Sequence, residues 1–255
     1  MNKKNIFILA GIGSAVIITM LIIILVKRRK KTYKKVVKPK NILIIGDSIS
    51  SIYSKSSKNL IKTQWSYLVK ENLKEKNINV DILALGGMAS KWMLGSLKDY
   101  LEGKEVNTSQ PKTTQVNFKN NLIMSGDKKY DIVIIYTGVN DAFGNDNNRG
   151  YKNVQEMVDI AKKMGAKVYV ILGYEQDNNI LNYKLMTTTR YVPTNEAFKP
   201  LVENYIKWQK DIPTLINGAS FIPKFDLKGE TRDGTHPSVN GHKIIKDSVL
   251  KSINI

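Results

Sequence analysis

The sequence predicts an α/β domain, built on a parallel β-sheet that helices cover on both faces and preceded by a single transmembrane helix. Three features of the sequence support this prediction. An apolar run lies near the N-terminus, a basic stretch follows it, and from residue 41 onward short apolar runs alternate with amphipathic segments. Uninterrupted apolar strands that alternate with helices are typical of a parallel sheet buried on both faces. Because the sequence shows no internal repeat, we interpret residues 41–255 as one domain.

The predicted transmembrane helix spans residues 6–26, after a short tail of residues 1–5. The run is 21 residues long and carries no charge. As a helix it extends about 31 Å, close to one hydrocarbon core. A cleaved signal peptide is the alternative, but the run is longer than a usual signal-peptide core and no small-x-small cleavage site follows it. The sequence therefore favours a retained single-pass anchor.

A basic linker, residues 27–40, follows the predicted span with nine Lys and Arg side chains, from Lys27 to Lys40. Such a flank is expected to contact anionic lipid headgroups, and a nuclear-localisation signal is a weaker interpretation beside a spanning helix. The positive-inside rule would place the main domain on the cytoplasmic side.

The overall net charge of +18 comes mostly from this end of the chain. Residues 1–40 hold 11 basic and no acidic side chains, which leaves 29 basic and 22 acidic side chains, a net charge of +7, for the rest. We therefore expect no nucleic-acid partner. The absence of cysteine excludes disulfides, thiolate nucleophiles and cysteine-ligated metals. Any imidazole chemistry must use His236 or His242.

The elements of the main domain follow in order. The first strand, residues 41–45, is a run of Ile and Leu that stops at Gly46. A helix over residues 60–76 follows from apolar side chains at helical spacing, and a second strand over residues 80–85 ends at Gly86-Gly87. Residues 88–101 again have helical periodicity.

The second half of the domain repeats the alternation. Residues 131–136, Asp-Ile-Val-Ile-Ile-Tyr, form the most strand-like run of the chain, and residues 167–172 form another strand that stops at Gly173. Apolar spacing predicts helices over residues 154–164, 196–210 and 238–253, the last with Ser238 as a possible N-cap. A short strand is expected at residues 219–222.

Polar residues follow the ends of these strands. They are Gly46-Asp47-Ser48, Gly86-Gly87, Gly138-Val139-Asn140-Asp141 and, before the closing helix, Asp233-Gly234-Thr235-His236. The carboxyl ends of parallel strands meet at one edge of a sheet, so a hydroxyl, an imidazole, a carboxylate and amide donors are expected to converge there. Each group alone is explained by an ordinary turn or cap. Together they are the parts of a serine acyl-transfer site.

These four blocks, in this order, resemble those of the SGNH, or GDSL-type, hydrolases. The resemblance covers about residues 42–250, and the segment His236-Pro237-Ser238-Val239-Asn240-Gly241-His242 is similar to the family's entry into its last helix. It implies a three-layer α/β/α sandwich of flavodoxin-like type, and ester hydrolysis or acyl transfer without a metal or organic cofactor. Anchored proteins of this family more often work outside the cytoplasm, so the side of the membrane stays open.

The chemistry of the residues and the resemblance agree on their roles. Ser48 is the expected nucleophile, His236 its general base and acid, and Asp233 the carboxylate that orients the imidazole. The oxyanion donors are the backbone N–H groups of Ser48 and Gly87 and the side-chain amide of Asn140. Gly86 is the alternative to Gly87.

The remaining polar residues near the blocks receive structural roles. Asp47 and Asp141 are expected to brace their loops, and His242 to pack or cap within the closing helix. A zinc site built from Asp233, His236 and His242 matches no standard spacing and is not favoured.

The substrate is less well defined by the sequence. Residues 175–194 and 103–127 are polar insertions, and the first is either a lid or a plain surface excursion. Because neither has a long apolar lining, a short acyl group on a polar alcohol, such as an O-acetylated glycan, is favoured. Met88, Trp92 and Met93 are candidates for an acyl pocket or for the core. An esterase, an O-acyltransferase with the same triad and an inactive anchored module all remain open.

Overall fold

The computed structural model describes residues 41–52, 61–104, 129–174, 195–227, 229–232 and 236–255, with the side chains of 195–199 excepted. These residues belong to one compact unit, Pro39–Ile255. The predicted anchor, residues 6–26, and the basic linker lie outside them. Within the described ranges no helix has the length and apolar character needed to cross a membrane.

The described residues contain a five-stranded, fully parallel sheet with the strand order β2-β1-β3-β4-β5. The strands are β1 (Asn41–Gly46), β2 (Asn79–Ala84), β3 (Ile132–Tyr136), β4 (Lys167–Ile171) and β5 (Ser220–Ile222). Ile42, Leu43, Ile44 and Ile45 have no exposed surface, as a central strand covered on both faces requires. The predicted parallel sheet is confirmed.

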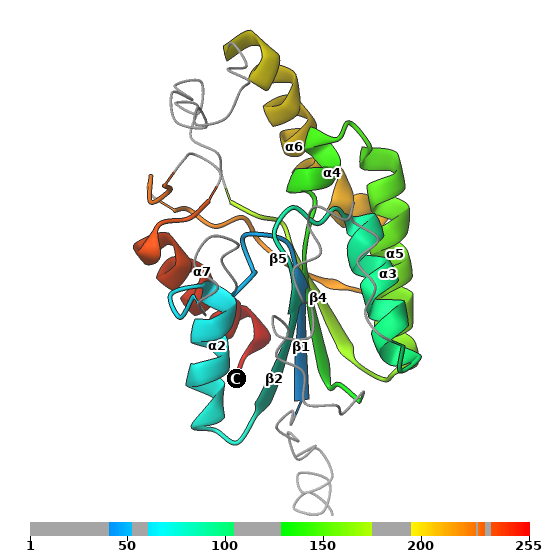
Figure 1. Cartoon of the computed structure of the whole chain (residues 1–255), viewed down its shortest axis with the longest axis vertical. Coiled ribbons are helices and arrows are strands. Elements are labelled where there is room, and N and C mark those ends of the chain that lie inside the picture. The colour runs from blue at the N-terminus through cyan, green and yellow to red at the C-terminus, as the bar shows by residue number, and fades with distance from the viewer. Residues whose placement is uncertain (1–40, 53–60, 105–128, 175–194, 228, 233–235) are drawn as a thin grey trace, which may run out of the picture. The chain divides into compact units, whose positions relative to one another are not determined.

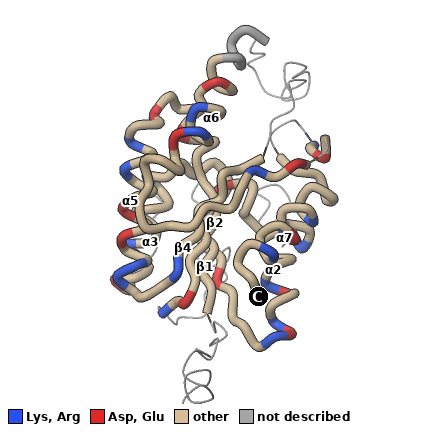
Figure 2. The backbone as a smooth tube through the Cα atoms, turned by 180° about the vertical axis from the view of Figure 1, so that it is seen from behind, with Lys and Arg blue, Asp and Glu red and all other residues tan. Residues whose placement is uncertain are grey.

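Helices cover both faces of this sheet, which gives the predicted three-layer α/β/α arrangement. Figure 1 shows α2 and α7 on one face and α3 and α5 on the other. Their bounds are α2 (Trp65–Lys74), α3 (Ser90–Leu101), α5 (Asn147–Lys163) and α7 (Val239–Ile253). Seen from behind, charged residues follow the helices and loops, whereas the strands carry few charges (Figure 2). Burying the apolar strands and one face of each helix drives this layering.

Two further helices lie at the carboxyl end of the sheet. The short α4 (Val139–Phe143) directly follows β3, and α6 (Asn195–Leu215) packs against it. The side chains of Tyr205, Trp208 and Ile212 on α6 are fully buried, at the spacing of one helical face. Trp208 stacks on Tyr151 of α5 with ring centroids 4.7 Å apart.

Close packing by Trp208 explains two differences from the sequence prediction. Helix α5 begins at Asn147 instead of residue 154, and Gly150 in its first turn is buried against this indole. A Cβ added to Gly150 would lie 2.5 Å from the Trp208 ring, so the glycine makes room for the contact. The helix α4, which was not predicted, starts at Gly138, whose φ of 118° and whose contact with Trp208 both exclude a side chain.

Candidate active site

The register of the sheet brings the predicted site loops together. Gly46, the last residue of β1, pairs with Ala84 of β2 on one side and with Tyr136 of β3 on the other. The residues that follow these three strand ends therefore leave the sheet at the same edge. The strand order reverses between β1 and β3, and crevices at such switch points bind ligands in parallel α/β sheets.

A tight turn after β1 presents Ser48. The backbone N–H groups of Ser50 and Ser51 donate to the carbonyl of Asp47, at 3.1 and 2.8 Å. The Asp47 carboxyl oxygen Oδ1 accepts from the N–H of Ile49 at 2.9 Å. A Cβ on Gly46 would lie 2.4 Å from Ser50 Oγ, so only glycine allows the chain to turn here. Asp47 thus braces the turn while the Ser48 side chain stays partly accessible.

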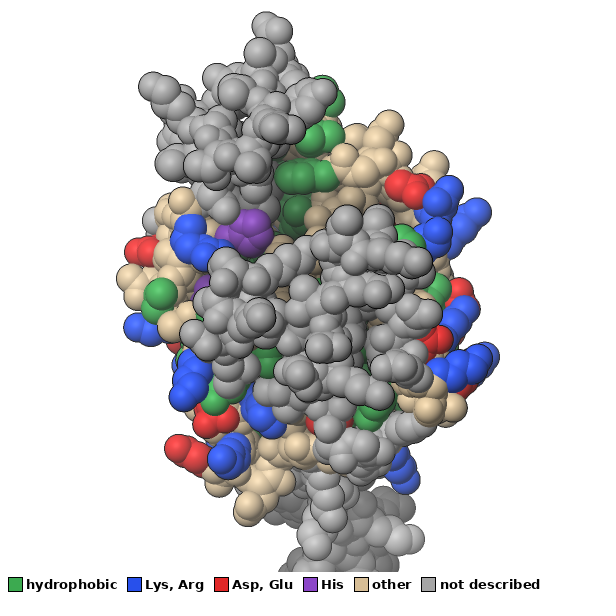
Figure 3. Space-filling model, viewed as in Figure 1, with side chains coloured by type: hydrophobic (Ala, Val, Ile, Leu, Met, Phe, Trp, Pro, Cys, Tyr) green, Lys and Arg blue, Asp and Glu red, His purple; other side chains and the backbone are tan. Residues whose placement is uncertain are grey.

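The structure places His236 directly against this serine. Ser48 Oγ and His236 Nε2 lie 3.0 Å apart, within hydrogen-bond distance, although 188 residues separate them in the chain. When Nε2 accepts this bond, the ring proton is on Nδ1, where a carboxylate can hold it. Asp233, the predicted carboxylate, lies outside the described residues. Figure 3 shows histidine on this face of the molecule beside a group of hydrophobic side chains.

The loops after β2 and β3 are joined through Asn140. Its side-chain Nδ2 donates to the carbonyl of Met88 at 2.9 Å, which uses one of the two amide hydrogens. The other amide hydrogen has no acceptor among the described residues. Gly87 has φ of 79°, and a Cβ there would meet nothing within 4 Å. Gly86 is the glycine nearer the nucleophile, since a Cβ on it would lie 3.8 Å from Ser48 Cβ.

Asp141 links the loops that follow β2 and β3 through hydrogen bonds of its side chain. Its buried carboxylate accepts hydrogen bonds from the Ser90 backbone N–H at 3.0 Å, from Ser90 Oγ at 2.6 Å and from Thr137 Oγ1 at 3.3 Å. Burial raises the pKa of Asp141, and the hydrogen bonds from Ser90 oppose that shift. Ser90 begins α3, where a carboxylate also interacts favourably with the helix dipole. Sequence reasoning missed Ser90, although a serine at the start of an apolar helical run is a known N-terminal signal.

The interior behind Ser48 holds several buried polar groups. Asp47 is 1% exposed, and its Oδ2 finds no hydrogen-bond partner among the described residues. Burial raises the pKa of Asp47 to about 7, while the bond from Ile49 and the charge of His236 lower it. Burial, followed by the neighbouring charge of Asp47, raises the pKa of Tyr205 on α6. Sequence reasoning did not identify this aromatic neighbour, because α6 is distant in the chain.

His242 lies in the closing helix and has a different environment. It is 4% exposed, and its Nδ1 has no partner among the described residues. Burial lowers the pKa of His242 to about 4, and the charges of Arg232 and His236 add to the shift. Ser238 caps this helix, as predicted, by accepting from the backbone N–H of Gly241 at 3.1 Å. His242 is therefore a neutral packing residue at pH 7.

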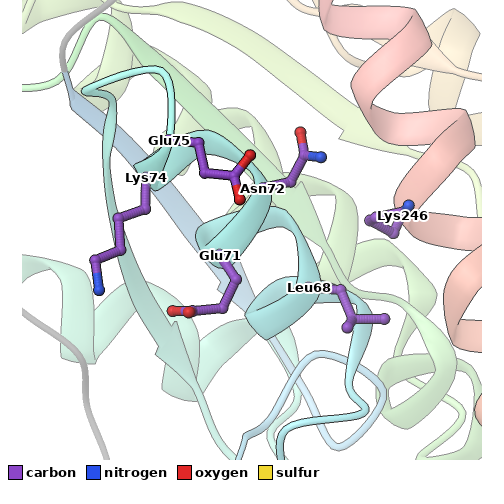
Figure 4. A pocket seen from close by; sticks show the side chains of 6 residues that line it. All are labelled: Leu68, Glu71, Asn72, Lys74, Glu75 and Lys246. Atoms are coloured by element: carbon purple, nitrogen blue, oxygen red, sulfur yellow. The ribbon is translucent and has the colours of Figure 1, made fainter.

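The other predicted contributors are partly described. Met88 and Met93 are buried in the core and Trp92 packs against it, which agrees with the core interpretation of these side chains. Of the predicted insertions, residues 105–127 of the first and all of 175–194 lie outside the described residues. A cavity of about 610 Å³ between α2 and α7 is lined by Leu68 and by five polar or charged side chains, none of which is a predicted site residue (Figure 4). Within the described ranges, no group of three or more His, Asp or Glu side chains is placed to hold a metal ion.

Solved structures with similar folds support the architecture. The acetylxylan esterase Axe2 from Geobacillus stearothermophilus matches with a TM-score of 0.53 at 15% identity, over 85% of this chain and 94% of that one. The esterase EstA from Pseudoalteromonas sp. matches with a TM-score of 0.51 at 16% identity, over 84% and 97%. LAE5, an alpha/beta hydrolase enzyme from the metagenome of Lake Arreo, gives 0.53 at 14% identity, over 84% and 95%. At these identities the likeness establishes the fold.

The family itself is established by the sequence. A search of curated proteins found no significant match. The family model of the GDSL-like lipases and acylhydrolases, however, matches residues 44–244, well over half of the chain. This range includes the blocks that contain Ser48, Gly87, Asn140 and His236. The chain therefore belongs to the GDSL-like lipase/acylhydrolase family, the SGNH-type serine hydrolases that act on ester bonds.

Proposed function

We propose that this protein is a serine esterase that removes short acyl groups from polar alcohols, using Ser48, His236 and Asp233. The observation that carries the proposal is the 3.0 Å approach of Ser48 Oγ to His236 Nε2 at the carboxyl edge of the sheet. A serine hydroxyl is a weak nucleophile until a base accepts its proton, and this distance permits that transfer. In a chain of this family, the pair is the expected nucleophile and base.

The reaction follows from these positions in two steps. Ser48 Oγ attacks the ester carbonyl carbon while His236 Nε2 takes its proton, and the same imidazolium then protonates the leaving alcohol. Water, activated by His236, attacks the acyl-enzyme and releases the acid and the free serine. We assign to Asp233 the orientation of the imidazole and the stabilisation of its charged form.

The oxyanion requires hydrogen-bond donors that are already in place. We assign this role to the second amide hydrogen of Asn140 Nδ2 and to the backbone N–H groups of Ser48 and Gly87, with Gly86, the glycine nearer Ser48, as the alternative to Gly87. The bond from Asn140 to Met88 supports the assignment, because it holds the amide in one orientation before substrate arrives. Loss of one such donor typically costs about 2.7–4 kcal/mol of transition-state stabilisation.

For the substrate we propose O-acetyl groups on glycans. The polar insertions of the sequence favour a polar alcohol, and the similar fold of Axe2 belongs to an acetylxylan esterase. Met88 and Met93 support a short acyl group, since both side chains are buried in the core and neither lines an accessible acyl pocket in the described part of the chain. Transfer of the acetyl group to a sugar acceptor uses the same residues and is the alternative outcome of the test.

The test uses the purified full-length chain and a fluorophosphonate, which labels only an activated serine. We expect labelling of the wild type, none of Ser48→Ala, and strongly slowed labelling of His236→Ala and Asp233→Asn. An unlabelled wild type that is folded would refute the proposal and leave the inactive-module interpretation. Hydrolysis of p-nitrophenyl acetate should exceed that of the octanoate ester. Acetylated product formed on added oligosaccharide would instead identify a transferase.

We also propose that residues 6–26 anchor the enzyme in a membrane as a single-pass helix, with the domain beginning near residue 41. The uncharged length of the run and the basic residues 27–40 support this proposal, and the latter are expected to contact anionic headgroups. Two assays test this proposal: extraction of membranes with high salt or alkaline carbonate tests the anchor, and protease treatment of intact and of opened vesicles tests the side of the domain. A chain released by high salt or alkaline carbonate would contradict an integral anchor, and protection in one orientation would identify the side.

A further inference from the structure

The segment that carries His236 is held by one carboxylate outside the predicted triad. On either side of residues 233–235, the chain forms the stem of a hairpin, with Thr231 bridged to Pro237 in antiparallel pairing. The backbone N–H of Arg232 donates to the carbonyl of His236 at 2.8 Å, and that of Ser238 donates to the carbonyl of Glu230 at 2.9 Å. Glu230 therefore lies at the base of the stem.

The side chain of Glu230 joins this stem to the first turn of α7. Its Oε2 accepts a short hydrogen bond from Ser238 Oγ, and its Oε1 lies 3.5 Å from Asn240 Nδ2. Ser238 Oγ in turn accepts from the backbone N–H of Gly241 at 3.1 Å. The hydroxyl thus links the carboxylate to the helix N-terminus, where a negative charge is stabilised by the helix dipole.

The backbones of Glu230 and Gly241 also pack closely against each other. A Cβ added to Gly241 would lie 2.4 Å from the Glu230 carbonyl oxygen and 3.0 Å from Pro237 Cβ. Helix α7 is also well buried, with Ile245 and Val249 fully inaccessible. The helix therefore provides a rigid support, and Glu230 attaches the histidine segment to it within two residues of His236.

We propose that Glu230 is a positioning residue for catalysis, which acts through Ser238 to hold the His236 imidazole within reach of Ser48. This inference rests on the proposed serine esterase function. Proton transfer depends steeply on geometry, and a displacement of about 1 Å can cost a hundredfold in rate. Glu230 touches neither the nucleophile nor the imidazole, so its loss should slow the chemical step without weakening substrate binding.

The test compares Glu230→Ala and Glu230→Gln in the full-length chain, with Asp247→Asn as the matched control. Asp247 is an exposed carboxylate on α7, the helix to which Glu230 is joined, and it pairs with Lys246. For Glu230→Ala we expect kcat on p-nitrophenyl acetate to fall about tenfold or more with KM nearly unchanged. Glu230→Gln keeps an oxygen that accepts from Ser238 and should stay within about threefold of wild type. The Asp247→Asn variant should match wild type.

Titration of active sites with the fluorophosphonate separates positioning from loss of folded protein. If Glu230 positions His236, nearly all Glu230→Ala molecules become labelled, but the rate constant of labelling falls as kcat does. A reduced labelled fraction with a wild-type rate constant would overturn the inference, as would a Glu230→Gln variant as slow as Glu230→Ala. The double variant Glu230→Ala/Ser238→Ala should be no slower than Ser238→Ala, because both substitutions remove the same hydrogen bond between Glu230 and Ser238.

Further outcomes separate a failure of this inference from a failure of the proposed function. If Glu230→Ala does not fold, Ser238→Ala carries the same prediction, and a wild-type rate for it overturns the inference. A wild-type chain that fails to react with the phosphonate refutes the proposed function. A reactive wild type with equally fast Glu230→Ala refutes only the role of Glu230.

Discussion

Replacement of Asp47 by asparagine should increase the stability of the protein relative to wild type as the pH rises. The carboxyl is buried behind Ser48, and among the described residues only its Oδ1 has a hydrogen-bond partner, the N–H of Ile49 at 2.9 Å. An asparagine Oδ1 accepts the same bond. The variant therefore keeps the brace of the turn and removes the ionisation.

The magnitude follows from the two pKa values of this group. Burial raises the pKa of Asp47 from 3.8 to about 7 in the folded protein. At pH values between these two pKa values, Asp47 keeps its proton in the folded state and has lost it in the unfolded state. The free energy of unfolding therefore falls as the pH rises. The slope is at most about 1.4 kcal/mol per pH unit. From pH 5 to pH 8, Asp47→Asn should gain about 2.6 kcal/mol relative to wild type.

Urea unfolding of the full-length chain in detergent, at pH 5, 6, 7 and 8, measures this gain. Trp65 and Trp208 are fully buried, so tryptophan fluorescence reports unfolding of the domain. Glu203→Gln, an exposed carboxylate on α6, is the control and should differ from wild type by a constant amount. Comparison of variant with wild type at each pH cancels the contribution of His242. Parallel stability curves for Asp47→Asn and wild type from pH 5 to pH 8 would refute the reasoning.

Three other predictions concern the oxyanion donor, a glycine and the second histidine. Asn140→Ala should lower kcat on p-nitrophenyl acetate by about 10²–10³ with little change in KM, and a loss below threefold would exclude it as a donor. Gly138→Ala should reduce the free energy of unfolding in urea by at least about 2 kcal/mol, because its φ is 118° and its Cβ would lie 2.0 Å from Trp208 Nε1. Gly95→Ala, at a helical position with nothing within 4 Å, should be stabilising and serves as its control. His242 has a folded pKa of about 4 against 6.5 unfolded, so its contribution to stability is lost as the pH falls from 6.5 towards 4. Thermal unfolding should show that His242→Leu lacks this loss, and an unchanged pH dependence would contradict it.

The order of elements was predictable from local patterns. The runs of β1 and β3 are apolar enough to be recognised as buried strands, and the helical spacing of α3 and α7 is visible without any tertiary information. Ser238 was also recognised as an N-cap, because a cap depends on the chain within three residues. The short helix α4 was missed since five residues are too few for a period to show.

Within the site, sequence and structure contribute different information. Residue types and their order predicted Ser48, Asn140 and His236 as site residues, because acyl transfer needs a hydroxyl, an amide donor and an imidazole at strand ends. The distance from Ser48 to His236 depends on the alignment of β1 with its neighbours and on the support of α7. No local pattern encodes that distance.

Short-range periodicity and motifs a few residues long were sufficient to predict the layered fold, the hydrolase family and a set of candidate reacting groups. The contacts that surround these candidates became visible only in the folded chain. The contacts of Asp141 with Ser90, of Gly138 with Trp208 and of Glu230 with Ser238 follow from how separate segments pack. Burial behind Ser48 likewise set the raised pKa of Asp47, because desolvation depends on every segment that excludes water from the carboxyl.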